Sequence, residues 1–103
     1  MTVYFPPLEK GGKVLRYEDG ASALLGFVGL GDGGMVAETT RSVHLTAKGR
    51  VVLCAPLSKQ YWLLDEASAL AMLLGVEGGA ADASLTDTGR EWLAARRHMV
   101  EEA

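Results

Sequence analysis

Imidazole and thiol groups are the side chains of this sequence best suited to catalysis or metal binding. They belong to His44, His98 and Cys54. Neither histidine is spaced from the cysteine, a serine or an aspartate in a pattern typical of a catalytic triad or a metal site. We therefore expect no enzyme, no metal and no other cofactor. An enzyme would require one histidine to lie beside Cys54 or a carboxylate in a cleft.

Basic side chains gather in two parts of the chain and are the candidates for contact with nucleic acid. The first group is Arg41, His44, Lys48 and Arg50, and the second group is Arg90, Arg96 and Arg97. Together they could form one surface that contacts phosphates. The alternative, which we favour for the second group, is a solvated helix face on which Arg97 pairs locally with Glu101.

Aromatic and acidic residues at positions 61–66 are the candidates for contact with a partner protein. Tyr61 and Trp62 bury a large area at a small entropy cost when they anchor an interface. Asp65 and Glu66 follow them and would face a basic partner. The alternative is that the aromatic side chains belong to the core of this small chain. A homodimer would satisfy both interpretations.

Two stretches of the chain, 18–55 and 65–95, share a residue pattern. Each contains Ala-Ser-Ala-Leu, then an acidic residue before Gly-Gly, then Leu-Thr-x-x-Gly-Arg-x-x-Leu-x-Ala. The pattern predicts two related halves, each made of a helix, a turn, an extended segment, and a helix or strand. Chance similarity among common residues is the alternative to an internal repeat.

Hydrophobic spacing and capping residues predict the individual elements. A helix with Leu63, Leu70 and Leu74 on one face is expected to end at Gly75. A second helix is expected from Thr86 or Asp87 to about residue 102, and its residues expected to face the core are Trp92, Leu93, Ala95, Met99 and Val100. Gly89 weakens the first turn of this helix by about 1 kcal/mol relative to alanine. Strands are expected at 2–5, 13–17 and 35–45, while 50–55 fits a strand or a helix.

The run 63–95 resembles the end of a winged-helix domain. Leu74-Gly75-Val76-Glu77 matches the close of a helix before a β-wing, and Leu85-Thr86-x-x-Gly89-Arg90 matches the start of the last helix. The resemblance implies a winged-helix-like or helix-turn-helix-like fold and a transcriptional regulator that binds DNA. The chain departs from the family in having little room for three helices before the wing.

Charge placement disfavours DNA as the partner. The formal net charge is −3, so the chain lacks the broad cationic field of a protein that binds phosphates. No lysine or arginine lies between Gln60 and Gly89, where a recognition helix would fall, and the acidic residues there would repel DNA.

Length and composition are consistent with one small domain over residues 1–103. The chain has 49 % hydrophobic and 22 % charged residues, and its single cysteine excludes an internal disulfide. No apolar stretch reaches the roughly 20 residues that span a bilayer, so we expect a cytoplasmic protein without membrane contact.

We expect an α+β, winged-helix-like domain that works as a non-enzymatic regulatory or adaptor protein. Its partner would be a basic protein or a second copy of the chain. One such role is that of an inhibitor that occupies the surface of a nucleic-acid-binding machine. A DNA-binding transcriptional regulator with the winged-helix-like fold is the alternative.

Overall fold

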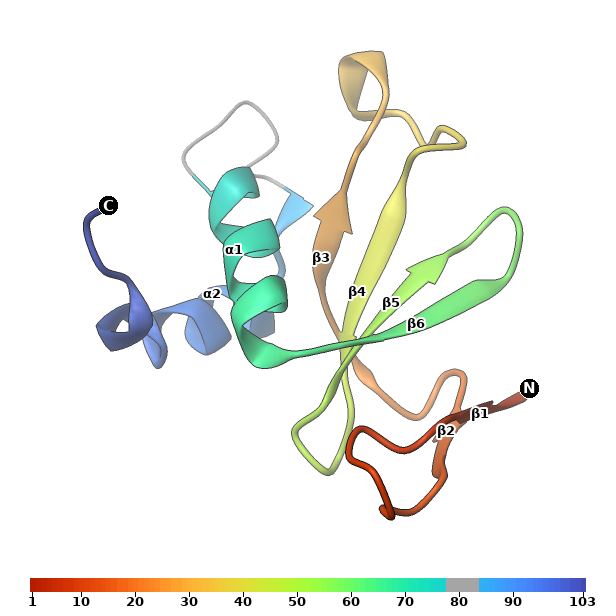
Figure 1. Cartoon of the computed structure of the whole chain (residues 1–103). Helices are drawn as coiled ribbons and strands as arrows, with labels where there is room; N and C mark the ends of the chain where they lie inside the picture. The colour runs from red at the N-terminus through yellow and green to blue at the C-terminus, as the bar shows by residue number, and fades with distance from the viewer. Residues whose placement is uncertain (78–83) are drawn as a thin grey trace.

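The computed structural model describes residues 1–77 and 84–103, in which six strands form two antiparallel sheets (Figure 1). The first two strands, β1 (Thr2–Phe5) and β2 (Leu15–Glu18), pair as a separate hairpin. The other four pair in chain order, each with the next: β3 (Ala23–Val28), β4 (Arg41–Leu45), β5 (Val51–Ala55) and β6 (Gln60–Leu64).

Two α-helices follow the strands and pack on one face of the four-stranded sheet. They are α1 (Glu66–Val76) and α2 (Asp87–Ala94), and a short 3-10 turn at Arg97–Met99 follows α2. A 3-10 turn at Asp32–Gly34 lies in the connection between β3 and β4. No helix within 1–77 or 84–103 is long and apolar enough to cross a membrane.

The two faces of the four-stranded sheet carry different cores, because side chains along a strand alternate between the faces. On the helix side, Leu25, Val43 and Val51 pack against apolar residues of α1 and α2. On the hairpin side, Val52 packs against Phe5 and Tyr17 of the β1–β2 hairpin. The helix side therefore holds the larger core, and the hairpin side a smaller one.

The structure confirms the α+β class, but the winged-helix fold is wrong. A winged helix is rich in helices, whereas strands dominate the described residues here and the helices only flank a sheet. The turn and wing expected before Leu85 fall largely on residues 78–83, which lie outside the described residues. The Leu-Thr-x-x-Gly-Arg segment at 85–90 does begin a helix, as predicted, but this helix packs along β3.

The two stretches with a shared pattern adopt different structures. Segment 18–55 forms β3, β4 and β5 and contains no α-helix, whereas the described part of 65–95 contains α1 and α2. The expected pair of halves with one architecture is therefore wrong, because the sheet pairing of 18–55 overrides its local similarity to 65–95. A duplication of the sequence itself remains a prediction.

Several expected element boundaries also change. Leu63 belongs to β6, and α1 continues through Gly75 to Val76. The last helix ends at Ala94, and Ala95, Met99 and Val100 after it are exposed rather than turned toward the core. Strand β4 begins at Arg41, and the ambiguous segment 50–55 contains strand β5.

Candidate functional site

The β3 edge of the four-stranded sheet is covered by residues 84–86. Leu85 forms an isolated bridge with Gly26, and the Thr86 backbone N–H donates to the Leu25 carbonyl at 3.1 Å. The Thr86 hydroxyl donates to the Leu24 carbonyl at 2.6 Å, and the Ser84 hydroxyl donates to the Phe27 carbonyl at 2.9 Å. Carbonyl groups that a free edge would present to another chain are thus already bonded.

Helix α2 is fixed close to β3 by its first turn. Thr86 is its N-cap and accepts the Gly89 N–H at 3.0 Å. A Cβ on Gly89 would overlap the carbonyl oxygen of Leu25. Glycine at this position therefore allows the close approach of helix and strand, an advantage that outweighs its low helix propensity.

The opposite edge, β6, is open. β6 pairs with β5, and in the part of the chain that the structure describes no backbone hydrogen bond joins its other side to another segment. β1 contacts β6 but belongs to the other sheet. Figure 1 shows the β5–β6 hairpin extending away from both helices. The edge can therefore accept a further strand.

The two aromatic residues predicted to anchor a partner lie on opposite sides of β6. Trp62 is paired with Leu53 and shares the helix side with it, whereas Tyr61 is paired with Cys54 on the hairpin side. Trp62 is 40 % exposed, beyond the area that the helices cover. Only one of the two aromatic side chains is thus well placed to meet a partner.

Arg41 contacts the Trp62 indole. The guanidinium carbon lies 5.6 Å from the centre of the Trp62 ring, which is within the range of a cation–π contact. The same guanidinium donates hydrogen bonds to the carbonyls of Glu38 at 2.6 Å and Thr40 at 3.0 Å. Arg41, predicted to contact phosphates, therefore supports the exposed tryptophan.

Tyr61 joins β6 to the N-terminal hairpin. Its hydroxyl donates to Asp19 Oδ2 at 2.9 Å, and its ring centre lies 5.9 Å from that of Tyr17. Burial raises the pKa of the Tyr61 hydroxyl well above its ordinary value, and the Asp19 carboxylate raises it further. The Tyr61 side chain therefore stabilises the packing of the hairpin on β6.

The two acidic residues predicted to face a partner have roles within the helical part. Asp65 is the N-cap of α1, where its carboxylate accepts the Ser68 N–H at 2.7 Å. This bond and a second one from the Ser68 hydroxyl hold the pKa of Asp65 below its ordinary value. The Glu66 carboxylate lies 3.1 Å from Arg96 Nε. Both carboxylates thus have partners in the fold.

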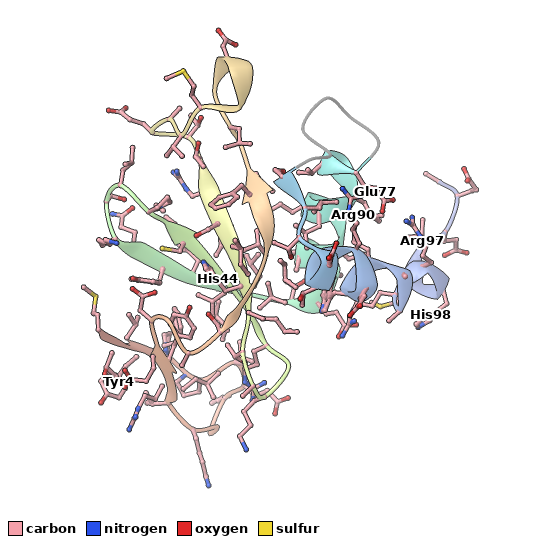
Figure 2. The ribbon with its side chains drawn as sticks, turned by 180° about the vertical axis from the view of Figure 1, so that it is seen from behind. Tyr4, His44, Glu77, Arg90, Arg97 and His98 are labelled. Atoms are coloured by element: carbon pink, nitrogen blue, oxygen red, sulfur yellow. The ribbon has the colours of Figure 1, made fainter. Side chains whose placement is uncertain are left out.

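The predicted basic residues do not gather into one surface. Arg41 stands at the start of β4, whereas Lys48 and Arg50 flank Gly49 in the turn after its end. Figure 2 shows His44 on the sheet, well apart from Arg90 and Arg97 in the helical part.

The arginines that follow α2 are engaged in the fold. The Arg96 guanidinium lies 4.2 Å from the centre of the Trp92 ring, in addition to its contact with Glu66. Arg97 Nη2 contacts both carboxylate oxygens of Glu77, at 2.6 and 2.7 Å. The expectation that Arg97 pairs locally with Glu101 is thus replaced by a bond to the end of α1.

His44 forms a polar pair on the hairpin side. Its Nε2 lies 2.8 Å from Ser42 Oγ, and Ser42 also bonds more weakly to the Cys54 carbonyl at 3.5 Å. Burial lowers the pKa of His44, and Asp19 opposes this shift in part. Ser42 is only 5 % exposed, so the pair satisfies buried polar groups and presents no accessible nucleophile.

His98, the second histidine, lies in the short turn after α2. Within the described ranges, no three histidine, cysteine, aspartate or glutamate side chains are grouped so as to hold a metal ion. The absence of enzymatic activity remains a prediction.

Two hollows lie beside the sheet. One, of about 500 Å³, is between the β1–β2 hairpin and the β4–β5 turn, and Phe5, Tyr17, Val52, Lys48 and Arg50 are among its lining residues. The other, of about 890 Å³, is bordered by the β3–β4 connection and residues 84–86. His44, Ser42 and Cys54 line neither.

No protein-family model, curated protein or solved structure matches this chain. Function is therefore inferred from the geometry of the chain itself.

Sequence reasoning predicted that Trp62 contacts a partner, but it missed the features that surround Trp62 in the structure. The alternation of side chains along a strand would have separated Tyr61 from Trp62 if residues 60–64 had been recognised as a strand. The open edge carries no local sequence signal, because it depends on which strands pair. The hollow at the hairpin likewise depends on how the hairpin packs on Val52.

Proposed function

We propose that this protein is a non-enzymatic adaptor or regulatory protein that binds an extended segment of a partner protein along β6. The contrast between the two sheet edges carries the proposal: β3 is covered, and β6 is open beside an exposed tryptophan. An open edge supplies backbone donors and acceptors for a further strand. Trp62 supplies the apolar contact that gives such an interface its strength.

The partner segment should be extended and should place an apolar side chain on Trp62. Successive residues of an added strand would alternate between the helix side, where Trp62 and Arg41 lie, and the hairpin side. A basic partner is favoured at long range by the net charge of −3. We leave Asp65 and Glu66 out of the proposed surface, because their carboxylates are bonded to Ser68 and Arg96.

A second copy of the chain is the alternative occupant of β6. Two β6 strands could pair across a two-fold axis and extend the sheet through both copies. Sedimentation equilibrium over a range of concentrations separates the two cases. A monomer at all concentrations supports a different partner protein, whereas a dimer that Trp62→Ala disrupts supports self-association.

Inhibition of a nucleic-acid-binding machine is one form that adaptor function would take. Direct DNA binding is less favoured, because Arg96 and Arg97 are engaged with Glu66 and Glu77. A regulator of this kind would act by occupying a partner's surface, and β6 is the segment of this chain that we propose for that contact.

The test is a selection of binding peptides from a random library, followed by affinity measurements on purified variants. Trp62→Ala should weaken binding of the selected peptides by about tenfold or more, as expected for an interface anchor. Tyr4→Ala is the matched control, because Tyr4 is an aromatic residue of β1 with 66 % exposure (Figure 2). Equal affinity for the wild type and Trp62→Ala, with both folded by circular dichroism, would overturn the proposal.

A further inference from the structure

The hollow of about 500 Å³ under the N-terminal hairpin has the size of a small-molecule site, since such sites occupy roughly 300–1,000 Å³. Its apolar wall consists of Phe5, Tyr17 and Val52, which are buried, together with Leu15 and Leu63. Phe5 and Tyr17 have ring centres 6.4 Å apart and form one aromatic part of this wall.

The rim of this hollow carries an excess of positive charge. Arg16 and Glu18 line it too, but Arg16 Nη2 lies 3.1 Å from Glu18 Oε1, so these two charges offset each other. Glu18 also accepts the Thr2 hydroxyl at 2.6 Å. Lys48 and Arg50 have no ion pair with any side chain in the described residues.

Hydrogen bonds to Thr46 order the backbone of the β4–β5 turn that carries these two residues. The Thr46 carbonyl accepts the Gly49 N–H at 2.9 Å, and the Thr46 hydroxyl accepts the Arg50 N–H at 3.1 Å. Gly49 has a φ of +81°, a conformation that glycine adopts readily. The turn is therefore a defined structure with one cationic side chain on each side of the glycine.

We propose that this hollow binds a small amphipathic anion, with its apolar body against Phe5, Tyr17 and Val52 and its carboxylate or phosphate head at Lys48 and Arg50. The apolar wall would shelter the body from water, and the two cations would bind the head group. Charge complementarity thus selects an anion over a neutral amphiphile. This site is separate from β6 and does not rest on the proposed protein partner.

The experiment is a titration of isotope-labelled protein with decanoate, decyl phosphate and decanol, followed by backbone amide chemical shifts. The two anions are kept below their micelle concentrations and decanol below its solubility limit. Decanoate or decyl phosphate should shift the amides of Tyr17, Val52 and Leu63, and the tighter of the two identifies the head group. Decanol should bind at least about fivefold more weakly, because it lacks the charge. Equal binding of decanol, or shifts confined to other regions, would overturn the proposal.

Variants test the two parts of the site separately. Lys48→Gln and Arg50→Gln should each weaken binding of the anion roughly three- to tenfold, whereas Lys10→Gln, outside the hollow, should not. Ala47→Trp should abolish binding by filling the hollow from an exposed lining position. Trp62→Ala should leave binding unchanged, so failure here is distinguishable from failure of the β6 proposal. Unchanged affinity in the doubly substituted Lys48→Gln, Arg50→Gln protein would refute the assignment.

Discussion

The two edges of the four-stranded sheet differ: β3 is covered by another segment of the chain, and β6 is open. At β3, residues 84–86 bond to the carbonyls of Leu24, Leu25 and Phe27, and α2 lies close to the strand. At β6, in the described residues, no further segment pairs with the edge, and Trp62 remains 40 % exposed. An uncovered edge is a liability that proteins ordinarily blunt. The difference indicates that β3 is closed by the fold itself, and it is the basis of our proposal that β6 binds a partner.

The N-caps of the two helices also differ in whether they bond to a sheet edge. Thr86 caps α2 and also bonds to β3, so it joins helix and sheet edge through one hydroxyl. Asp65 follows β6 and caps α1, and its carboxylate accepts hydrogen bonds from Ser68 of the same helix. Loss of the first cap should therefore disturb a sheet edge, whereas loss of the second should affect one helix terminus.

Gly89→Ala should have the largest effect, because it breaks the covered edge. The new Cβ would overlap the Leu25 carbonyl oxygen and push α2 away from β3. We expect the free energy of unfolding to fall by about 3 kcal/mol, as measured by urea denaturation. Gly75→Ala is the matched control: it is also a helical glycine, its Cβ would meet nothing within 4 Å, and it should stabilise the protein by up to about 1 kcal/mol. A tolerated Gly89→Ala would show that this close contact does not fix the edge.

Thr86→Ala should have the second-largest effect and lower the free energy of unfolding by about 2 kcal/mol. It removes the cap of α2 and the hydroxyl bonds to the Leu24 and Leu25 carbonyls. Thr86→Ser keeps the hydroxyl and should recover most of the loss. Urea denaturation gives the energies, and faster amide exchange in β3 would locate the damage. Equal stability of the alanine and serine variants would contradict this role.

Trp62→Ala should lower the free energy of unfolding by about 1 kcal/mol or less, although tryptophan is a much larger side chain than Thr86. The indole is partly in solvent and contacts Arg41 at the surface, so its removal loses only part of a buried area. A loss as large as that of Gly89→Ala would show that Trp62 belongs to the core, and the contrast between the edges would then fail.

Asp65→Asn should have the smallest effect at neutral pH and a distinct pH dependence. The Asp65 pKa is lowered in the fold by bonds from Ser68, so the carboxylate adds stability above its unfolded value of about 4, and this is lost as the pH falls through the folded pKa. Asparagine also caps helices but does not titrate. As the pH is lowered through the acidic range, urea denaturation should show a smaller fall in the free energy of unfolding for Asp65→Asn than for the wild type. An identical loss in both proteins would exclude this role.

Local sequence signals predicted the parts of the fold that depend on local chemistry. The cap at Thr86 marks the start of α2, and the apolar residues at 2–5 form β1, both as expected. Trp92 and Leu93 are buried, also as expected from their spacing. The class of the fold follows from the mixture of such signals.

The six-residue pattern Leu-Thr-x-x-Gly-Arg, which occurs twice in the chain, shows why the rest of the fold could not be predicted from the sequence. Leu-Thr-x-x-Gly-Arg at 45–50 ends β4 and forms a turn in which Gly49 has a positive φ, whereas at 85–90 it begins α2. The role of Gly89 depends on Leu25, which is more than 60 positions away in the chain. Tertiary pairing thus decided between a turn and a helix, and it also decided which edge stays open.

Amide hydrogen exchange of the protein with and without a selected peptide tests the central claim most directly. If the partner adds a strand to β6, amides of Gln60–Leu64 should become protected on binding while those of β3 keep the exchange rates of the free protein. Protection that appears at β3 or in the helices, with β6 unchanged, would contradict the account.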